Sequence, residues 1–218
     1  MCSHKTQCEL LEVANRAIAH YYQRFPFTWR CPHAIDLELL TLELMGSSIK
    51  MLPLSKDGSL LGMTAHERIT VQMELVDGTV IRDTLLPKDI VVDSSLAGFR
   101  NTGVRNFTLA HEIGHYLLRA HFPFDNLSYE MEEEFADIIA VGILLPECLV
   151  RASMALFHFP DTLPYISRSN LDVHYPCFKE MARHLGVQRQ LLAERMKYLN
   201  ILTSDVPYRQ SLLLLEGR

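Results

Sequence analysis

Residues 105–115 read RNFTLAHEIGH, the most informative stretch of this sequence. Because residues four apart lie on one face of an α-helix, His111 and His115 can reach the same metal ion, while Glu112 points at a water on that metal. The flanking residues on both sides are mostly apolar, whereas a helix exposed to solvent would be mostly polar. The stretch therefore predicts a packed helix that carries two metal ligands and a general base.

A catalytic zinc takes three protein ligands and keeps one open position, so a third ligand has to come from elsewhere. His121 follows His115 by six residues, which gives the HExxHxxxxxH spacing of the metzincins. Those proteins have a glycine inside that spacer to turn the chain back, and here the position is Leu118. In an unbroken helix His121 lies more than a turn beyond the site, so it is the less favoured third ligand.

The favoured third ligand is Glu133, in the acidic segment that follows. Glu133 and Asp137 are four residues apart and share a helix face, as in the ExxxD arrangement of the gluzincins. We expect Glu133 to bind the metal and Asp137 to accept the outer N–H of a metal-bound histidine. Small residues on both helices allow the close approach this requires: Ala110, Gly114, Ala136 and Ala140. For the neighbouring Glu130, Glu132 and Glu134 we expect only a solvated, charged face.

These two segments carry a family resemblance. Residues 105–115 resemble the RxxFTLAHExGH segment of the ImmA/IrrE family of bacterial and phage metallopeptidases, and residues 133–146 resemble its second signature, which closes in Leu-Leu-x-Pro. Asp137 stands where the family usually has Asn, and the closing residues 144–146 lack the residue often found before the proline. The resemblance implies a zinc-dependent endopeptidase that cleaves a helix-turn-helix repressor, with Glu133 in the place of the family's glutamate ligand.

The hydrophobic pattern predicts an α+β fold: a small, mostly antiparallel sheet packed on a zincin-like helical core, with a C-terminal helix pair. Expected helices are 6–25, 35–45, 103–119, 128–145, 147–157, 176–185 and 187–199, and expected strands are 49–54, 69–75, 79–85 and 90–93. The Asp77-Gly78 pair predicts a tight hairpin turn between two of the strands.

A proline- and serine-containing stretch around residues 159–176 suggests a boundary, and we expect a metallopeptidase domain at 1–165 and a helical, helix-turn-helix-like segment at 166–218. Residues 168–218 hold eight Lys and Arg against five Asp and Glu, a faint basic bias. Direct DNA binding through 176–200 is therefore possible, but the leucines and Met196 in the second helix favour packing, so we expect a scaffold or docking role.

The composition excludes other classes of protein. The chain has 218 residues and a formal charge of -5, and its longest apolar run falls well short of the ~20 residues that cross a bilayer. Five cysteines, odd in number and without a CxxC pair, argue against a disulfide framework and favour a reducing, cytoplasmic location. An acidic chain repels nucleic acid as a whole.

The predicted mechanism is attack of a zinc-activated water on a peptide carbonyl, with Glu112 removing the proton and passing it to the leaving nitrogen. The strand at 90–93 is the candidate edge for an extended substrate. The oxyanion donor stays open among His121, Tyr129, His158, Tyr165 and His174. The alternative function is a regulatory protein that keeps the metal fold and docks a protein partner or DNA without cleaving.

Overall fold

The computed structural model describes residues 3–26, 32–55, 57–74, 78–122, 127–159 and 171–202. The chain divides into two compact units, one of residues 1–21 and 35–143 and one of residues 22–34 and 144–218. The fold is α+β, as predicted, with helices predominating over small sheets. The predicted domain boundary after residue 165 lies outside the described residues, so that division stays a prediction.

A three-stranded sheet forms the centre of the first unit. Its strands are β1 (Ile49–Leu52), β2 (Gly62–Thr64) and β5 (Ile90–Asp93), in the order β1-β5-β2. β1 runs parallel to β5, and β2 runs antiparallel to it. The prediction of an edge strand at 90–93 is therefore wrong: β5 is hydrogen-bonded on both sides, and all four of its residues are buried.

The strand that takes the edge position is β2, which the sequence analysis did not find. It has only three residues and begins with Gly62, so it shows neither the alternation nor the β-branched composition that marks a strand. Its register against β5 pairs Gly62 with Val92 and Thr64 with Ile90. In the described part of the chain, β2 pairs with no strand on its other side.

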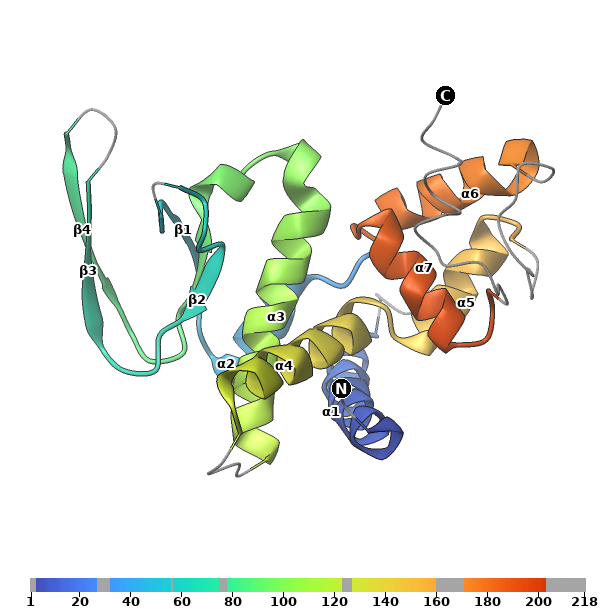
Figure 1. Cartoon of the computed structure of the whole chain (residues 1–218), viewed down its shortest axis with the longest axis horizontal. Helices are drawn as coiled ribbons and strands as arrows, with labels where there is room; N and C mark the ends of the chain where they lie inside the picture. The colour runs from blue at the N-terminus through green and yellow to red at the C-terminus, as the bar shows by residue number, and fades with distance from the viewer. Residues whose placement is uncertain are drawn as a thin grey trace. The chain divides into compact units, whose positions relative to one another are not determined.

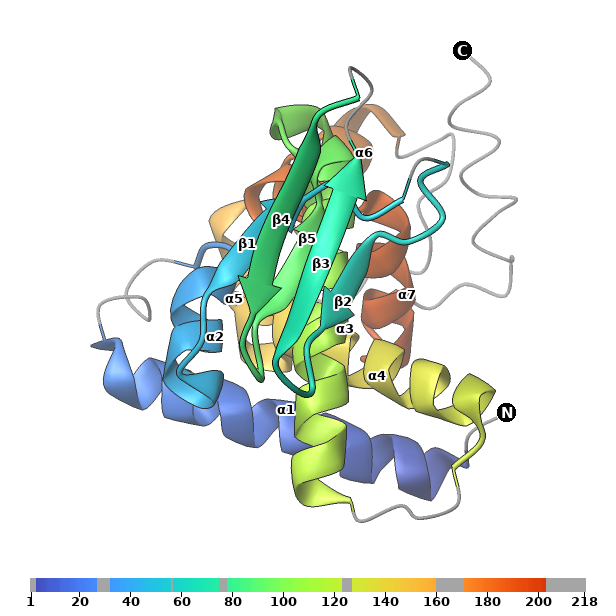
Figure 2. The same ribbon diagram turned by 90° about the vertical axis from the view of Figure 1, so that its left-hand side faces the viewer.

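The second sheet is the predicted hairpin of β3 (Ile69–Glu74) and β4 (Val80–Leu85). Of its turn, residues 75–77 lie outside the described ranges, and Gly78 has a φ of 82°, which favours glycine. The hairpin covers one face of the central sheet, as Figure 2 shows. Ala65, Leu85 and Val91 form the shared core between the two layers.

The helices of the first unit lie close to their predicted positions. They are α1 (His4–Arg24), α2 (Leu37–Met45), α3 (Thr102–His121) and α4 (Tyr129–Leu144). β5 leads into α3 through two 3-10 turns, η2 (Ser94–Leu96) and η3 (Phe99–Asn101). α3 lies on the face of the central sheet opposite the hairpin and contacts β2 and β5 (Figure 1). The helix that carries the candidate metal ligands thus packs against the sheet on one side.

Glycines set how closely α4 approaches its two neighbours. A Cβ atom on Gly114 of α3 would lie 2.7 Å from the carbonyl oxygen of Ala136 on α4. A Cβ on Gly142 would lie 2.6 Å from the Cβ of Ala14 on α1. Both distances are shorter than real Cβ contacts, so only glycine permits these helix crossings. The predicted close approach of the two site helices is confirmed at Gly114.

We expect Gly114→Ala to destabilise the fold and to weaken metal binding together. The added methyl group pushes α4 away, at an overpacking cost of about 1–3 kcal/mol, which the better helix propensity of alanine offsets by roughly 1 kcal/mol. Urea unfolding and a zinc titration measure the two effects. Ala120→Leu, which adds more bulk at an exposed position of α3, is the control and should change neither. Full stability and metal affinity in Gly114→Ala would contradict the role of this contact.

The second unit contains α5 (Glu147–Leu156), α6 (Leu171–His184) and α7 (Arg189–Tyr198). α6 begins at Leu171, so Pro176 lies inside the helix rather than at its start, where the sequence had predicted it. Leu192 and Met196 of α7 are fully buried, and Arg195 is buried too, with its Nε donating to the Leu145 carbonyl at 2.9 Å. The face of α7 that carries these three residues is therefore buried rather than exposed.

Within the described ranges, no single helix is both long and apolar enough to span a bilayer. α4 and α5 meet the length and composition requirement only when they are joined across the break between them.

Candidate active site

Three of the predicted site residues come together between α3 and α4 of the first unit. The Nε2 atoms of His111 and His115 are 3.0 Å apart. Glu133 from α4 places one carboxylate oxygen 3.3 Å from His111 Nε2 and the other 3.4 Å from His115 Nε2. Among the described residues this is the one group of histidine, cysteine and acidic side chains whose donor atoms converge as metal ligands do.

The donor set fits a zinc ion. Ligand atoms at roughly 2.0–2.1 Å from a tetrahedral centre lie about 3.3 Å from one another, close to the three distances seen here. Two imidazole nitrogens and one carboxylate are also a known ligand set of catalytic zinc, which leaves a position open. With Nδ1–H of His111 donated to Asp137, Nε2 of that ring carries the lone pair and can bind a cation.

Asp137 orients the first histidine. Its Oδ1 lies 2.8 Å from Nδ1 of His111, which leaves Nε2 directed at the cluster. Burial alone lowers the pKa of His111, but the hydrogen bond and the charge of Asp137 outweigh burial, and the pKa is raised. Burial and the neighbouring His111 lower the pKa of His115. The acceptor predicted for a ligand histidine is thus in place on His111.

Glu112 lies on the sheet side of α3, and only 7% of it is exposed. Burial raises its pKa, and a hydrogen bond from the Thr64 hydroxyl at 2.7 Å partly opposes that rise. A Cβ on Gly62 would lie 3.0 Å from a Glu112 carboxylate oxygen, so the glycine leaves room for the carboxylate. β2 therefore positions the candidate base, and sequence reasoning missed Thr64 and Gly62 because it missed the strand.

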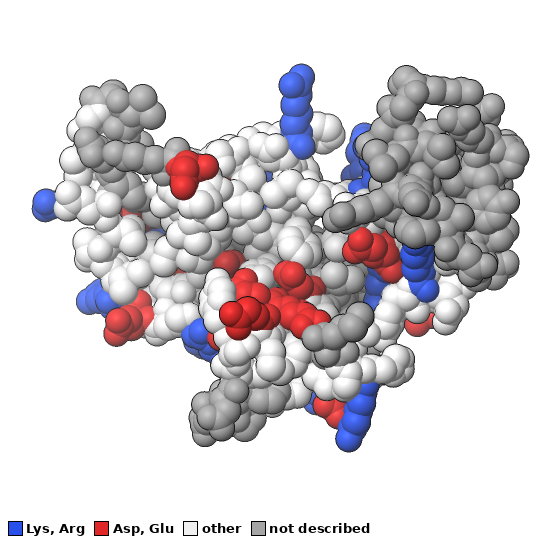
Figure 3. Space-filling model, in the orientation of Figure 1, with Lys and Arg blue, Asp and Glu red and all other residues white. Residues whose placement is uncertain are grey.

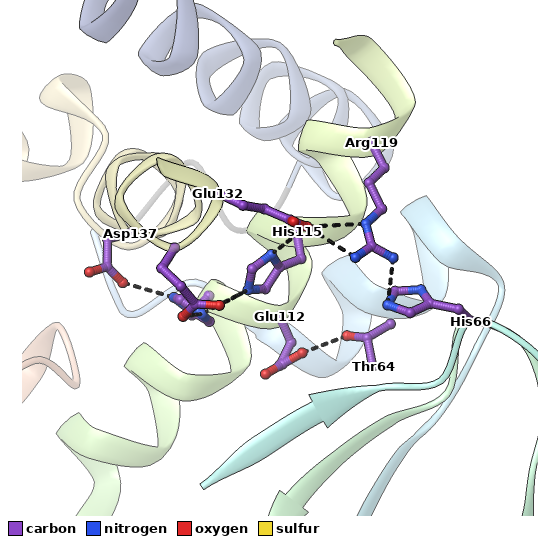
Figure 4. A network of polar contacts seen from close by, with 9 residues as sticks. Thr64, His66, Glu112, His115, Arg119, Glu132 and Asp137 are labelled. Carbon is purple, nitrogen blue, oxygen red and sulfur yellow. Dashed lines mark hydrogen bonds and ion pairs between the residues drawn. The ribbon is translucent and has the colours of Figure 1, made fainter. Parts of the chain in front are cut away.

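Glu132 is not the solvated residue that the sequence analysis expected. Its Oε1 accepts hydrogen bonds from the Arg119 guanidinium at 3.0 and 3.2 Å, and it lies 3.4 Å from Nδ1 of His115 (Figure 4). Arg119 in turn contacts Nε2 of His66 at 2.6 Å. Glu132 lies one residue before Glu133 and faces α3. The expectation failed because a run of acidic residues does not show which of its side chains face inward.

His121 lies apart from the cluster. α3 continues unbroken from Thr102 to His121, so the ring is carried about 9 Å along the axis beyond His115. His121 is exposed at the end of the helix and does not belong to the converging group. This position agrees with its rank as the less favoured third ligand.

Among the five candidates for the oxyanion donor, Tyr129 is the one that interacts with Glu133 of the cluster in the described part of the chain. It begins α4, one turn before Glu133. The charge of Glu133, followed by burial and a hydrogen bond to the same carboxylate, raises the pKa of the Tyr129 hydroxyl. His158 belongs to the second unit. Tyr165 and the side chain of His174 lie outside the described residues.

The arrangement is that of the zincin-like class of metallopeptidase fold. This class has a helix with two histidines four residues apart, a buried glutamate beside the first, and here an acidic residue from the next helix. The chain belongs to a peptidase family described as the IrrE N-terminal-like domain, whose model matches residues 66–197, more than half of the chain. The resemblance found in the sequence is thereby confirmed at the level of the family. A search of the curated proteins finds no match.

Proposed function

We propose that this protein is a zinc-dependent endopeptidase with His111, His115 and Glu133 as metal ligands and Glu112 as catalytic base. One observation carries the proposal: a carboxylate that is almost fully buried lies next to a converging cluster of two imidazoles and a carboxylate. A protein that used the metal only for stability would have no need of a base at this position. Membership in a peptidase family supports the same activity.

When bound, zinc lowers the pKa of a coordinated water to about 7 and polarises the carbonyl of the scissile bond. Glu112 takes the proton from the attacking water and delivers it to the leaving nitrogen. Its raised pKa suits this role, because a base that also has to act as an acid works best when its pKa lies nearer to neutral. Thr64 holds the carboxylate in place through its hydroxyl.

The open edge of β2 is the surface to which we assign the extended substrate. β2 contacts α3 and carries Thr64, so a peptide that adds a strand here runs past Glu112. This assignment replaces the edge predicted at 90–93. Tyr129, beside Glu133, is the donor that we propose for the oxyanion of the tetrahedral intermediate.

The proposed substrate is a DNA-binding repressor of the helix-turn-helix type, so that cleavage changes transcription. Figure 3 shows a patch of acidic side chains over the start of α4, where four of five successive residues are glutamates: Glu130, Glu132, Glu133 and Glu134. DNA-binding proteins carry basic surfaces, and this acidic patch would attract them. We also propose a cytoplasmic location, which is consistent with Cys8, Cys148 and Cys177 being thiols rather than disulfides in the described part of the chain.

Metal removal tests the proposal. Zinc-loaded protein is incubated with repressors encoded beside its gene, and the fragments are identified by mass spectrometry. We expect cleavage at one or a few sites, loss of cleavage after treatment with a chelator, and recovery on addition of zinc. Cleavage that survives complete removal of metal would contradict the proposal.

The second candidate function is a docking protein that binds its partner through the C-terminal helices without cleaving it. The packed face of α7 favours a protein scaffold over DNA reading, since Arg195 is turned inward to the Leu145 carbonyl and cannot contact bases. Binding of the partner without any cleavage, by metal-loaded protein, would support this alternative.

A further inference from the structure

The two candidate ligand histidines differ in how their outer nitrogens are held. His111 Nδ1 is bonded to Asp137 at 2.8 Å. His115 Nδ1 is buried and makes no hydrogen bond among the described residues. A buried ring nitrogen without a partner is costly, and a metal-bound histidine almost always donates its outer N–H to an acceptor. His115 therefore lacks the contact that would fix its tautomer and orientation.

One acceptor lies within a small movement of that nitrogen. Oε1 of Glu132 is 3.4 Å from His115 Nδ1, and the Glu132 side chain is only 26% exposed. A change of a few tenths of an ångström converts this separation into a charge-assisted hydrogen bond. Glu132 and Asp137 both project from α4, so one helix would supply the outer carboxylates of both histidines as well as the ligand Glu133.

Glu132 is itself held in place by Arg119. The Arg119 guanidinium donates two hydrogen bonds to Oε1, the same oxygen that faces His115. Arg119 also donates to Nε2 of His66, in the segment between β2 and β3, and burial together with the charge of Arg119 lowers the pKa of His66, which keeps it neutral as an acceptor. Figure 4 shows this chain running from His115 through Glu132 and Arg119 to His66.

We propose that Glu132 is a positioning residue for His115: it accepts the Nδ1–H, directs Nε2 at the metal, and is kept in place by Arg119 and His66. The inference rests on the metal site proposed above. It adds to that site a second outer carboxylate, which links the metal-site helix to the segment leading out of β2.

Zinc affinity, measured by competition with a chromophoric chelator, tests this role. We expect Glu132→Ala to bind zinc about 10–100-fold more weakly, the usual effect of removing an outer partner of a ligand histidine. Glu130→Ala is the matched control, because it removes the same charge from the same helix turn at an exposed position. Arg119→Gln should give a smaller loss, since it leaves Glu132 present but no longer held.

A spectroscopic readout separates positioning from a general structural role. In the zinc-loaded protein, ¹H–¹⁵N spectra of the imidazoles should show a slowly exchanging Nδ1–H on His115 in the wild type and in Glu130→Ala, and a fast-exchanging one in Glu132→Ala. Thermal unfolding of the metal-free proteins checks folding, and Glu132→Leu, which has a similar volume but no acceptor, serves if the alanine variant does not fold.

The outcomes distinguish this inference from the function it rests on. If the wild type binds zinc and Glu132→Ala binds it as tightly as Glu130→Ala, with an unchanged His115 signal, the positioning role is wrong and the metal site stands. If the wild type binds no zinc, both are wrong.

Discussion

Glu112→Gln is expected to lower the rate of substrate cleavage by about 100- to 10,000-fold, the usual contribution of a general base. Glutamine has the same shape as glutamate and can still accept the hydrogen bond from Thr64, but it cannot take a proton from water. Because Glu112 lies outside the converging cluster of His111, His115 and Glu133, zinc content and thermal stability should stay close to those of the wild type.

The experiment compares initial rates of repressor cleavage for zinc-loaded wild type, Glu112→Gln and Glu12→Gln. The last variant makes the same chemical change at an exposed residue of α1, outside the acidic patch, and should keep the full rate. Cleavage by Glu112→Gln at the wild-type rate would refute the proposed mechanism. If neither wild type nor variant cleaves but both bind the repressor, the docking function replaces it.

Glu133→Ala is expected to lose zinc binding, with an affinity more than 100-fold below that of the wild type, while His121→Ala keeps it. Removal of Glu133 leaves two imidazoles, whereas a catalytic zinc site requires three protein ligands. His121 lies beyond the cluster at the exposed end of α3, so its loss removes no ligand. This pair of variants decides between the gluzincin and metzincin arrangements.

Metal content after purification in zinc-containing buffer, followed by chelator competition, gives both affinities. Circular dichroism of the metal-free proteins confirms that each variant folds. Zinc retained by Glu133→Ala and lost by His121→Ala would place the protein in the metzincin-like class and remove the proposed role of α4 in binding the metal.

The features of this protein that depend on local spacing could be predicted from its residues alone. Two histidines four residues apart fix a shared helix face, and Glu133 with Asp137 repeats that spacing on the next helix. Gly114 opposite Ala136 shows how small residues, visible in the sequence, let the two helices approach. The helices and the β3–β4 hairpin followed from hydrophobic period and turn residues in the same way.

Contacts between segments far apart in the chain became visible only in the folded protein. Thr64 bonds to Glu112 across 48 residues of sequence, through a strand too short to show a period. Glu132 is one of three consecutive glutamates, residues 132–134, and the sequence does not show that its side chain meets Arg119, which in turn contacts His66. Local propensity carries no information on such partners, because a side chain's environment is fixed by which elements pack against it.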